Sequence, residues 1–234
     1  MSYLKLRRAR AILACFLVSS ILLWGFPAID LGISRIFFDA GFELQEQWWY
    51  RVARQALVHM IWISMLVIVG IGVFNRLSKQ ALCGICARKV CYLFLVLILG
   101  AGLIVNVLLK DHFGRARPRD IEEFGGSKRF TPAFVISSEC DNNCSFSSGE
   151  GAAGFFSLAL AMALSRRRAA LLSSIAIGSV VSLSRVAAGA HFFSDTVVSF
   201  FVMAILADGL YYYVVLSEPE RVEGPVVLLP GAAS

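Results

Sequence analysis

The sequence predicts an all-α, polytopic membrane protein, folded as a bundle of six transmembrane helices. Hydrophobic residues make up 58% of its 234 positions. Only 16% of the residues are charged, compared with about 25% in a typical soluble domain. Six apolar runs approach the ~20 residues that are needed to cross ~30 Å of hydrocarbon. These observations exclude an ordinary soluble fold.

The predicted spans account for most of the chain, which shows no internal repeat. They cover approximately residues 11–29, 56–75, 91–109, 151–165, 169–183 and 195–216. The fourth and fifth spans are short, so flanking residues at the membrane interface should complete their ends. The first run follows a basic segment, as in a signal peptide, but no small-residue cleavage site follows Trp24, which favours an uncleaved span. We expect one transmembrane domain over residues 1–216 and a loose tail over residues 217–234.

Clusters of basic residues predict the orientation of the spans. The clusters are Lys5, Arg7, Arg8 and Arg10; Arg76, Lys79, Arg88 and Lys89; and Arg166, Arg167 and Arg168. All three fall on one side of an even-numbered topology. Because positive residues near spans stay on the cytoplasmic side, both termini are expected there. These clusters explain most of the net charge of +6, and without a soluble basic domain no nucleic-acid partner is expected.

A long loop on the opposite side, approximately residues 30–54, is rich in aromatic residues. They are Phe37, Phe38, Trp48, Trp49 and Tyr50. Such side chains either anchor the second span at the membrane interface or contact a substrate directly. The anchoring role is favoured, because aromatic belts commonly flank membrane spans.

A second loop on this side, approximately residues 110–150, carries six basic and seven acidic residues. Its basic residues lie on the wrong side to set the topology, so they need another explanation. Arg115 and Arg119 either contact a substrate or are solvated. Cys140 and Cys144 either close a small disulfide in an oxidising compartment or remain free thiols.

Three charged segments meet on this face and together resemble a family signature. They read Lys110 to Arg117-Pro118 with six intervening residues, Ser147-Ser148-Gly149-Glu150, and Ser184-Arg185 followed by His191 and Asp195. This resembles the signature K-x6-R-P, P-S-G-H and S-R-x5-H-x3-D of the type 2 phosphatidic acid phosphatase (PAP2) superfamily. The outer two parts match at every fixed position, whereas Ser147 and Glu150 replace the proline and histidine of the middle part.

The spacing of His191 and Asp195 suits a nucleophile with an orienting carboxylate. Residues four apart share one face at the start of a helix. Asp195 can then accept the Nδ1–H of His191 and leave Nε2 free to attack.

The remaining motif residues suit the binding of a phosphoryl group. Lys110, Arg117 and Arg185 supply fixed positive charge, with bidentate hydrogen bonds from the arginines. Ser148 and Gly149 stand where the fourth predicted helix begins, so their backbone N–H groups are candidates to hold phosphate oxygens.

The resemblance implies a mechanism in which His191 attacks phosphorus, forms a phosphohistidine and is released by water. It also implies that neither a metal nor another cofactor takes part. Glu150 replaces the histidine that protonates the leaving oxygen in the family, and nearby cations favour an ionised carboxylate. We therefore expect Glu150 to position the hydrolytic water or a sugar hydroxyl, with water or His112 protonating the leaving oxygen.

A site at the membrane surface implies a lipid substrate. Residues 125–150, with their two cysteines, resemble the lipid A phosphatase branch, and the 4′-phosphatases more than the 1-phosphatases. This implies a bacterial inner-membrane enzyme with a periplasmic active site. The alternatives are an undecaprenyl diphosphate or phosphatidylglycerophosphate phosphatase, and a lipid-phosphate-binding protein without catalysis, which the His191 and Asp195 pair argues against. The oligomeric state stays open.

Overall fold

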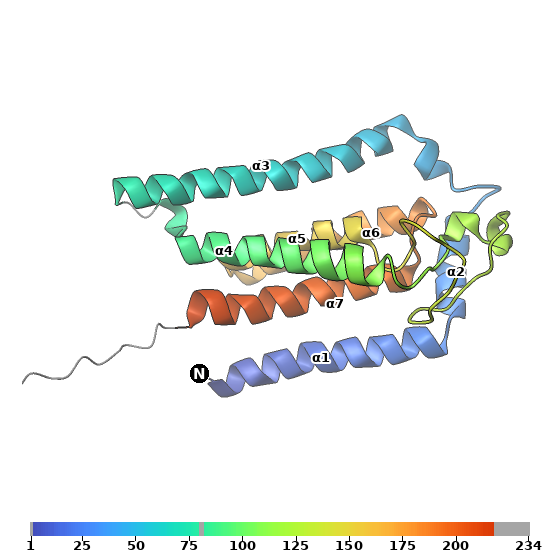
Figure 1. Ribbon diagram of the computed structural model, residues 1–234, viewed down its shortest axis with the longest axis horizontal. Coiled ribbons are helices and arrows are strands. Elements are labelled where there is room, and N and C mark those ends of the chain that lie inside the picture. Colours follow the sequence, from blue (N-terminus) through green and yellow to red (C-terminus); the bar gives the residue numbers. More distant parts are fainter. Residues whose placement is uncertain (1, 80–81, 218–234) are drawn as a thin grey trace, which may run out of the picture.

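The apolar runs form long helices that lie side by side along one direction (Figure 1). The computed structural model describes residues 2–79 and 82–217, and within these ranges the fold contains helices and loops but no strand. The predicted all-α class is therefore confirmed. The predicted tail lies outside the described residues except for Ser217.

Five stretches are long and apolar enough to cross a membrane. They belong to α1 (Ser2–Gly25), α3 (Trp48–Ser78), α4 (Ala87–Leu95) with the π-helical η3 (Val96–Leu109), α6 (Arg168–Ala187), and α7 (Phe193–Leu210) with the π-helical η6 (Tyr211–Leu216). The fourth predicted span is the shorter apolar helix α5 (Gly149–Leu164). Its 16 residues measure roughly 24 Å at 1.5 Å per residue. Five of the six predicted spans are therefore long enough to cross a membrane, and the sixth is the shorter helix α5.

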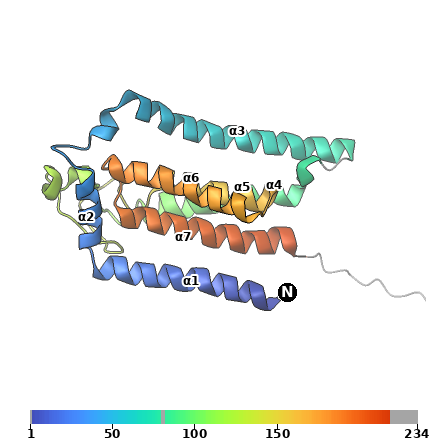
Figure 2. The ribbon, with the colours of Figure 1, turned by 180° about the vertical axis from the view of Figure 1, so that it is seen from behind.

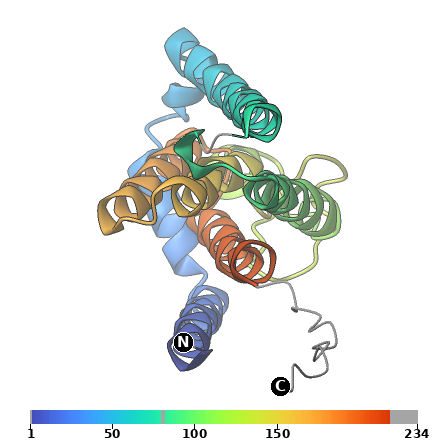
Figure 3. The same cartoon turned by 90° about the vertical axis from the view of Figure 1, so that its left-hand side faces the viewer.

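The short helix α5 lies at the centre of the bundle. It packs against α6, α7 and η3, as the end-on view in Figure 3 shows. Small residues permit this close packing. A Cβ atom added to Gly178 of α6 would lie 2.1 Å from the Phe155 ring of α5. Because protein surrounds α5 on several sides, little of it needs to face lipid.

Helices α1 and α3 lie at the periphery of the bundle (Figure 3). Only four of the 31 residues of α3 are buried, namely Tyr50, Met65, Ile68 and Asn75. Helix α1 packs against α7, and an ion pair of 3.0 Å joins Arg8 Nε to Asp208 Oδ1. Both helices expose large apolar side chains along their middle turns, among them Leu17, Ile21, Trp62 and Leu66, as expected of surfaces that face lipid.

The two ends of the bundle differ in structure. One end holds the start of α1, the connection from α3 to α4 through η2 (Leu82–Gly84), and the end of α7 (Figures 1 and 2). At the other end α2 (Ala28–Ile36) crosses the bundle, with the short 3-10 helices η1 (Glu43–Glu46), η4 (Pro118–Asp120) and η5 (Glu122–Phe124). We call this second end the loop end. All three motif segments reach it, as their alternation with the spans predicted.

The loop between η3 and α5 is folded against the bundle by apolar contacts with α7 and with residues just outside the helices. One cluster is formed by Phe42, Ala116, Ile121, Phe124 and Phe192, and a second by Ala133, Phe146 and Val198. Cys140 and Cys144 are joined in a disulfide, so the first of the two alternatives for these cysteines is the one observed. The loop is thus a packed layer over the helix ends.

Candidate active site

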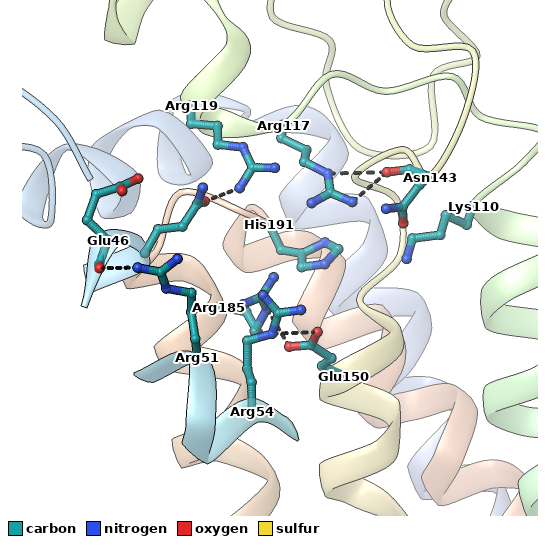
Figure 4. A pocket seen from close by; sticks show the side chains of 11 residues that line it. Glu46, Arg51, Arg54, Lys110, Arg117, Arg119, Asn143, Glu150, Arg185 and His191 are labelled. Atoms are coloured by element: carbon teal, nitrogen blue, oxygen red, sulfur yellow. Dashed lines mark hydrogen bonds and ion pairs between the residues drawn. The ribbon is translucent and has the colours of Figure 1, made fainter. Parts of the chain in front are cut away.

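The motif residues surround a cavity of about 370 Å³ at the loop end. It is lined by Gln45, Glu46, Arg51, Arg54, Lys110, Arg117, Arg119, Asn143, Glu150, Arg185 and His191. Figure 4 shows the imidazole of His191 among guanidinium groups that come from different parts of the chain. Six of the lining residues are basic and two are acidic, so the cavity is suited to an anion.

His191 lies in the turn between α6 and α7 and is only 3% exposed. The turn depends on Gly189, whose φ is +61° and whose added Cβ would lie 2.3 Å from the Phe42 ring. Glycine adopts this left-handed backbone at no steric cost. The Gly189 carbonyl also accepts the Arg119 N–H at 3.1 Å, which joins the first and third motif segments.

The orientation of the His191 ring is set by a backbone carbonyl. Its Nδ1 lies 2.7 Å from the oxygen of Ser145 but 3.7 Å from Asp195 Oδ2. A carbonyl only accepts hydrogen bonds, so Nδ1 carries the proton and Nε2 keeps its lone pair. The predicted direct hydrogen bond to Asp195 is therefore wrong, because α7 begins only at Phe193 and His191 lies outside the helix.

Asp195 supports His191 indirectly, through the backbone around it. Its Oδ2 accepts the hydroxyl of Ser145 and the N–H of Phe192 at 2.8 Å. Its Oδ1 accepts Nη1 of Arg115 at 2.6 Å. Asp195 thereby fixes both Ser145, which holds the imidazole, and the residue that follows His191.

Arg115 is neither solvated nor part of the cavity wall, contrary to both alternatives derived from the sequence. It is 1% exposed and pairs with Asp30 Oδ2 at 2.8 Å as well as with Asp195. Its guanidinium lies 4.1 Å from the centre of the Phe192 ring. Two carboxylates thus compensate this buried cation, as burial of a charge requires. Asp30, an acid just beyond the first apolar run, was the available sequence signal.

The predicted phosphate-binding cations Lys110, Arg117 and Arg185 all line the cavity. Nη2 and Nε of Arg117 donate to the Asn143 carbonyl at 2.6 and 3.2 Å. Nη1 of Arg185 donates to the Tyr50 hydroxyl at 2.7 Å. Burial lowers the pKa of Lys110, and the charges of Arg117 and Arg185 act in the same direction. The three cations are close enough to repel one another, so an anion between them is favoured.

The environment of His191 favours its neutral form. Burial lowers the pKa of His191 below its usual value of 6.5. Asp195 opposes this shift, whereas the positive charges of Arg185 and Arg117 reinforce it. A neutral imidazole is the form that can attack phosphorus.

Glu150 bridges two arginines at the cavity wall (Figure 4). Its Oε2 lies 2.8 Å from Nε of Arg185, and its Oε1 lies 3.1 Å from Nε of Arg54. Both carboxylate oxygens thus face N–H donors of guanidinium groups, which suits an acceptor of hydrogen bonds rather than a proton donor to a leaving oxygen. His112, the other donor considered, bonds through Nδ1 to the Val107 carbonyl and does not line the cavity.

The second motif segment starts α5 but does not supply both predicted N–H groups. Ser148 is buried, and its hydroxyl accepts the N–H of Gly151 as the helix cap. Its own N–H donates to the Asp195 carbonyl at 3.4 Å, so the predicted phosphate contact from Ser148 is corrected. Gly149 is partly exposed in the first turn of α5 but is not among the residues that line the cavity.

Several residues at the site were missed by the sequence analysis. The basic ones are Arg51 and Arg54, which lie in the first two turns of α3. Tyr50 is also part of the site, since it is 4% exposed, accepts a hydrogen bond from Arg185 and donates one to the Ser184 carbonyl at 3.1 Å. The favoured role of Tyr50 as a membrane anchor is therefore wrong, whereas Trp48 and Trp49 are exposed. Nothing in the sequence around Arg51 and Arg54, which directly follow the aromatic residues, indicated that these arginines line the cavity.

The disulfide stands next to two contacts of the site. Asn143 and Ser145 flank Cys144, and their carbonyls bind Arg117 and His191. The disulfide-closed loop and the residue that follows it therefore position Arg117 and His191 together. Among the residues that the structure describes, no group of three or more His, Cys, Asp or Glu side chains is arranged to hold a metal ion.

Comparison with known proteins agrees with this geometry. The family model described as the PAP2 superfamily matches residues 90–218. The chain belongs to the PAP2 superfamily. The resemblance inferred from the three motifs is thereby confirmed.

Three PAP2 relatives carry the name lipid A 4′-phosphatase. The protein of Francisella tularensis subsp. novicida is 42% identical over 113 residues, which are 47% of this chain and about half, 51%, of that relative. The protein of Rhizobium leguminosarum is 30% identical over 196 residues, 74% of this chain and 81% of the relative. That of Rhizobium etli is 30% identical over 194 residues, 73% of each chain. No solved structure matches the chain.

Proposed function

We propose that this chain is a membrane lipid phosphatase that removes the 4′-phosphate of lipid A at the periplasmic face of a bacterial inner membrane. The observation that carries the proposal is the meeting of the neutral, buried His191 with Lys110, Arg117 and Arg185 in one cavity. The three relatives named lipid A 4′-phosphatase support the choice of substrate.

The proposed reaction has two displacements at phosphorus. Nε2 of His191 attacks, so that an N–P bond forms while the P–O bond to the sugar breaks. Lys110, Arg117 and Arg185 hold the phosphoryl oxygens and balance their charge. Water protonates the departing sugar oxygen. A second water then attacks phosphorus, the N–P bond breaks, and inorganic phosphate leaves.

Two further residues have supporting roles in this proposal. Glu150 keeps Arg185 and Arg54 in place and is positioned to accept a proton from the hydrolytic water. The N-terminus of α5, which begins at Gly149, contributes the partial positive charge of a helix end beside Glu150 of the cavity wall. Asp195 acts on His191 through Ser145 and is therefore a positioning residue.

An apolar groove beside the cavity favours a lipid as the substrate. It lies between α3 and α6, has a volume of about 300 Å³ and includes Leu57, Met60, Val180 and Val181. Arg54, Glu150 and Arg185 line both the groove and the cavity. A headgroup phosphate beside His191 therefore leaves an acyl chain next to an apolar path into the membrane.

The orientation follows from the charges at the end opposite the loop end. Basic residues lie there, among them Arg8 beside Asp208, Arg76 in the last turn of α3 and Arg166 over the Tyr211 ring. The positive-inside rule favours a cytoplasmic location for this end. In this proposal the loop end faces the periplasm, and the disulfide of Cys140 and Cys144 supports this side because disulfides persist in oxidising compartments. An epitope inserted after the exposed Asp39 should react with antibody in intact spheroplasts, and labelling only after lysis would reverse the orientation.

Phosphate release from defined lipids tests the activity. Purified protein should release phosphate from lipid A, and mass spectrometry should locate the loss to the distal glucosamine. Undecaprenyl diphosphate and phosphatidylglycerophosphate belong in the same panel, and a preference for either would move the assignment to that lipid. His191→Ala should bind lipid without releasing phosphate. If the wild type also releases no phosphate, the alternative of a lipid-phosphate-binding protein without catalysis is favoured. Rapid quenching with labelled substrate should leave acid-labile phosphate on His191 only in the wild type.

A further inference from the structure

The cavity holds more positive charge than one phosphate can balance. Six basic and two acidic side chains line it, which leaves a formal charge of +4 when His191 is neutral. A phosphate monoester carries about −2 near neutral pH. About two positive charges therefore remain uncompensated when the scissile phosphate is bound. A headgroup that fills the cavity would also remove water from these charges, so they would lack a partner.

The excess charge lies at a definable place, on Arg51 and Arg119. Figure 4 shows both on the opposite side of His191 from Lys110. The short helix η1 holds them, because Nη1 of Arg119 donates to Gln45 Oε1 and Nη2 of Arg51 donates to the Glu46 carbonyl at 3.0 Å. We call these two residues the outer arginine pair.

The acids near the outer arginine pair do not remove its charge. Asp120 lies 3.7 Å from Nε of Arg119 but is 43% exposed and lies outside the cavity wall. Glu150 is already shared between Arg54 and Arg185. Glu46 contacts Arg51 through its backbone carbonyl, and Figure 4 shows its carboxylate directed away from Arg51. Burial lowers the pKa of Arg117, and the next largest cause is the positive charge of Arg119. The positive charge of Arg119 thus acts on Arg117 at the phosphate site.

We propose that Arg51 and Arg119 form a second anion subsite, which binds an acidic group attached to the same headgroup as the scissile phosphate. This proposal rests on the proposed function and specifies its substrate further. A cavity of about 370 Å³ is at the small end of ligand pockets, which span ~300–1,000 Å³. The two anionic groups must therefore be near neighbours. They are either the two phosphates of a diphosphate or a phosphate and the carboxylate of an adjacent acidic sugar.

Competition by small anions tests the subsite directly. Inorganic phosphate occupies one site, whereas methylene diphosphonate spans two and cannot be hydrolysed. The wild type should bind methylene diphosphonate about tenfold more tightly than phosphate in isothermal titration, since the exposed Arg51 and the partly exposed Arg119 add modest charge-assisted hydrogen bonds. In the double variant Arg51→Gln/Arg119→Gln, this preference should fall below about twofold.

The control replaces an arginine of the same loop outside the cavity. Arg129 is exposed and does not line the cavity, so Arg129→Gln should keep the full tenfold preference. If the double variant does not fold, each single variant should lose part of the preference. Equal binding of both anions by the wild type, or a preference that survives in the Arg51 and Arg119 variants, overturns the proposal.

Lipid substrates then identify the source of the second acidic group. The KM is measured for three forms of lipid A. They carry a 4′-monophosphate, a 4′-diphosphate, or a carboxylate-bearing sugar next to the 4′-phosphate. The form that fills the subsite should have a KM about tenfold lower, and this advantage should vanish in the double variant. Phosphate release with identical KM for all three lipids overturns the subsite while retaining the phosphatase. Diphosphonate preference without any phosphate release would instead overturn the proposed function alone.

Discussion

The imidazole of His191 is held by the backbone carbonyl of Ser145, at 2.7 Å from Nδ1. The hydroxyl of the same serine donates to Asp195. One residue between the Cys140–Cys144 disulfide and α5 therefore connects the proposed nucleophile to its acid. The orientation of the imidazole by the Ser145 carbonyl is therefore separate from the contact of Asp195 with the Ser145 hydroxyl, whereas a direct histidine–aspartate hydrogen bond would combine them.

Removal of the Ser145 hydroxyl tests the indirect connection. Ser145→Ala keeps the carbonyl that accepts from His191 but leaves Asp195 Oδ2 with the N–H of Phe192. The loss of one hydrogen bond should cost about 1 kcal/mol of stability and reduce kcat less than tenfold. Asp195→Asn should reduce kcat much more, because it also removes the negative partner of Arg115. Equal kcat values for the two variants would argue against a role for Asp195 beyond Ser145.

Removal of Arg115 should destabilise the fold rather than weaken substrate binding. Arg115→Ala leaves Asp30 and Asp195 buried without their shared cation, a change that costs about 3–5 kcal/mol. The melting temperature in detergent should fall strongly. Arg129→Ala, on the exposed part of the same loop, should change it little. A stable Arg115→Ala protein with raised KM would show instead that Arg115 contacts substrate.

Opening the disulfide should impair the site without unfolding the bundle. Cys140→Ser/Cys144→Ser frees the loop whose carbonyls bind Arg117 and His191. We expect kcat/KM to fall about tenfold, since a small misplacement of catalytic groups has effects of this size or larger. A reductant should lower wild-type activity to the same level and leave the variant unchanged. Full activity after verified reduction would contradict this dependence.

The ionisation of His191 should be measurable because the chain has only three histidines. Burial lowers the pKa of His191 below 6.5, with Arg185 and Arg117 adding to the effect. The ring is therefore neutral at pH 7 and should become protonated only as the pH falls below 6.5. Histidine NMR of the wild type, His59→Gln and His112→Gln would assign the signal. Arg117→Gln removes a positive charge and should raise the pKa of His191. An unchanged pKa would show that the charge of Arg117 does not act on the imidazole.

Neutralisation of Glu150 should impair turnover. Glu150→Gln removes the charge that holds Arg54 and Arg185, and the loss of a positioned proton-handling group typically costs at least ~10-fold in kcat. Glu122→Gln, at an exposed acid of the same loop outside the cavity, serves as the matched control. Wild-type turnover by the Glu150 variant would remove Glu150 from the mechanism.

Much of this arrangement could be predicted from local sequence patterns. Hydrophobic runs predicted the helices, because each span must satisfy its own backbone in lipid. The alternation of the motif segments with the spans predicted that Lys110, Arg117, Arg185 and His191 lie at the same end. The short length of α5 was also visible, although its central position, which explains that length, was not.

The contacts that could not be predicted join residues that are far apart in the chain. Arg115 meets Asp30 across 85 positions, and Arg185 meets Tyr50 across 135. No periodicity or spacing rule relates such pairs, because they depend on how α2 and the start of α3 fold over the bundle. The acceptor of the His191 proton was missed for a different reason. A backbone carbonyl has no side-chain identity by which the sequence could reveal it.

The sparse packing of α3 has a consequence for which lipids the protein accepts. Its first turns carry Tyr50 and Arg54 into the site, but few of the side chains beyond them are buried. The groove that α3 shares with α6 therefore has one wall that faces the bilayer. Acyl chains of different number or length can extend beyond the groove into the surrounding membrane. Selectivity among lipids therefore depends on the polar headgroup. Underacylated and fully acylated forms of one headgroup should accordingly be dephosphorylated at similar rates.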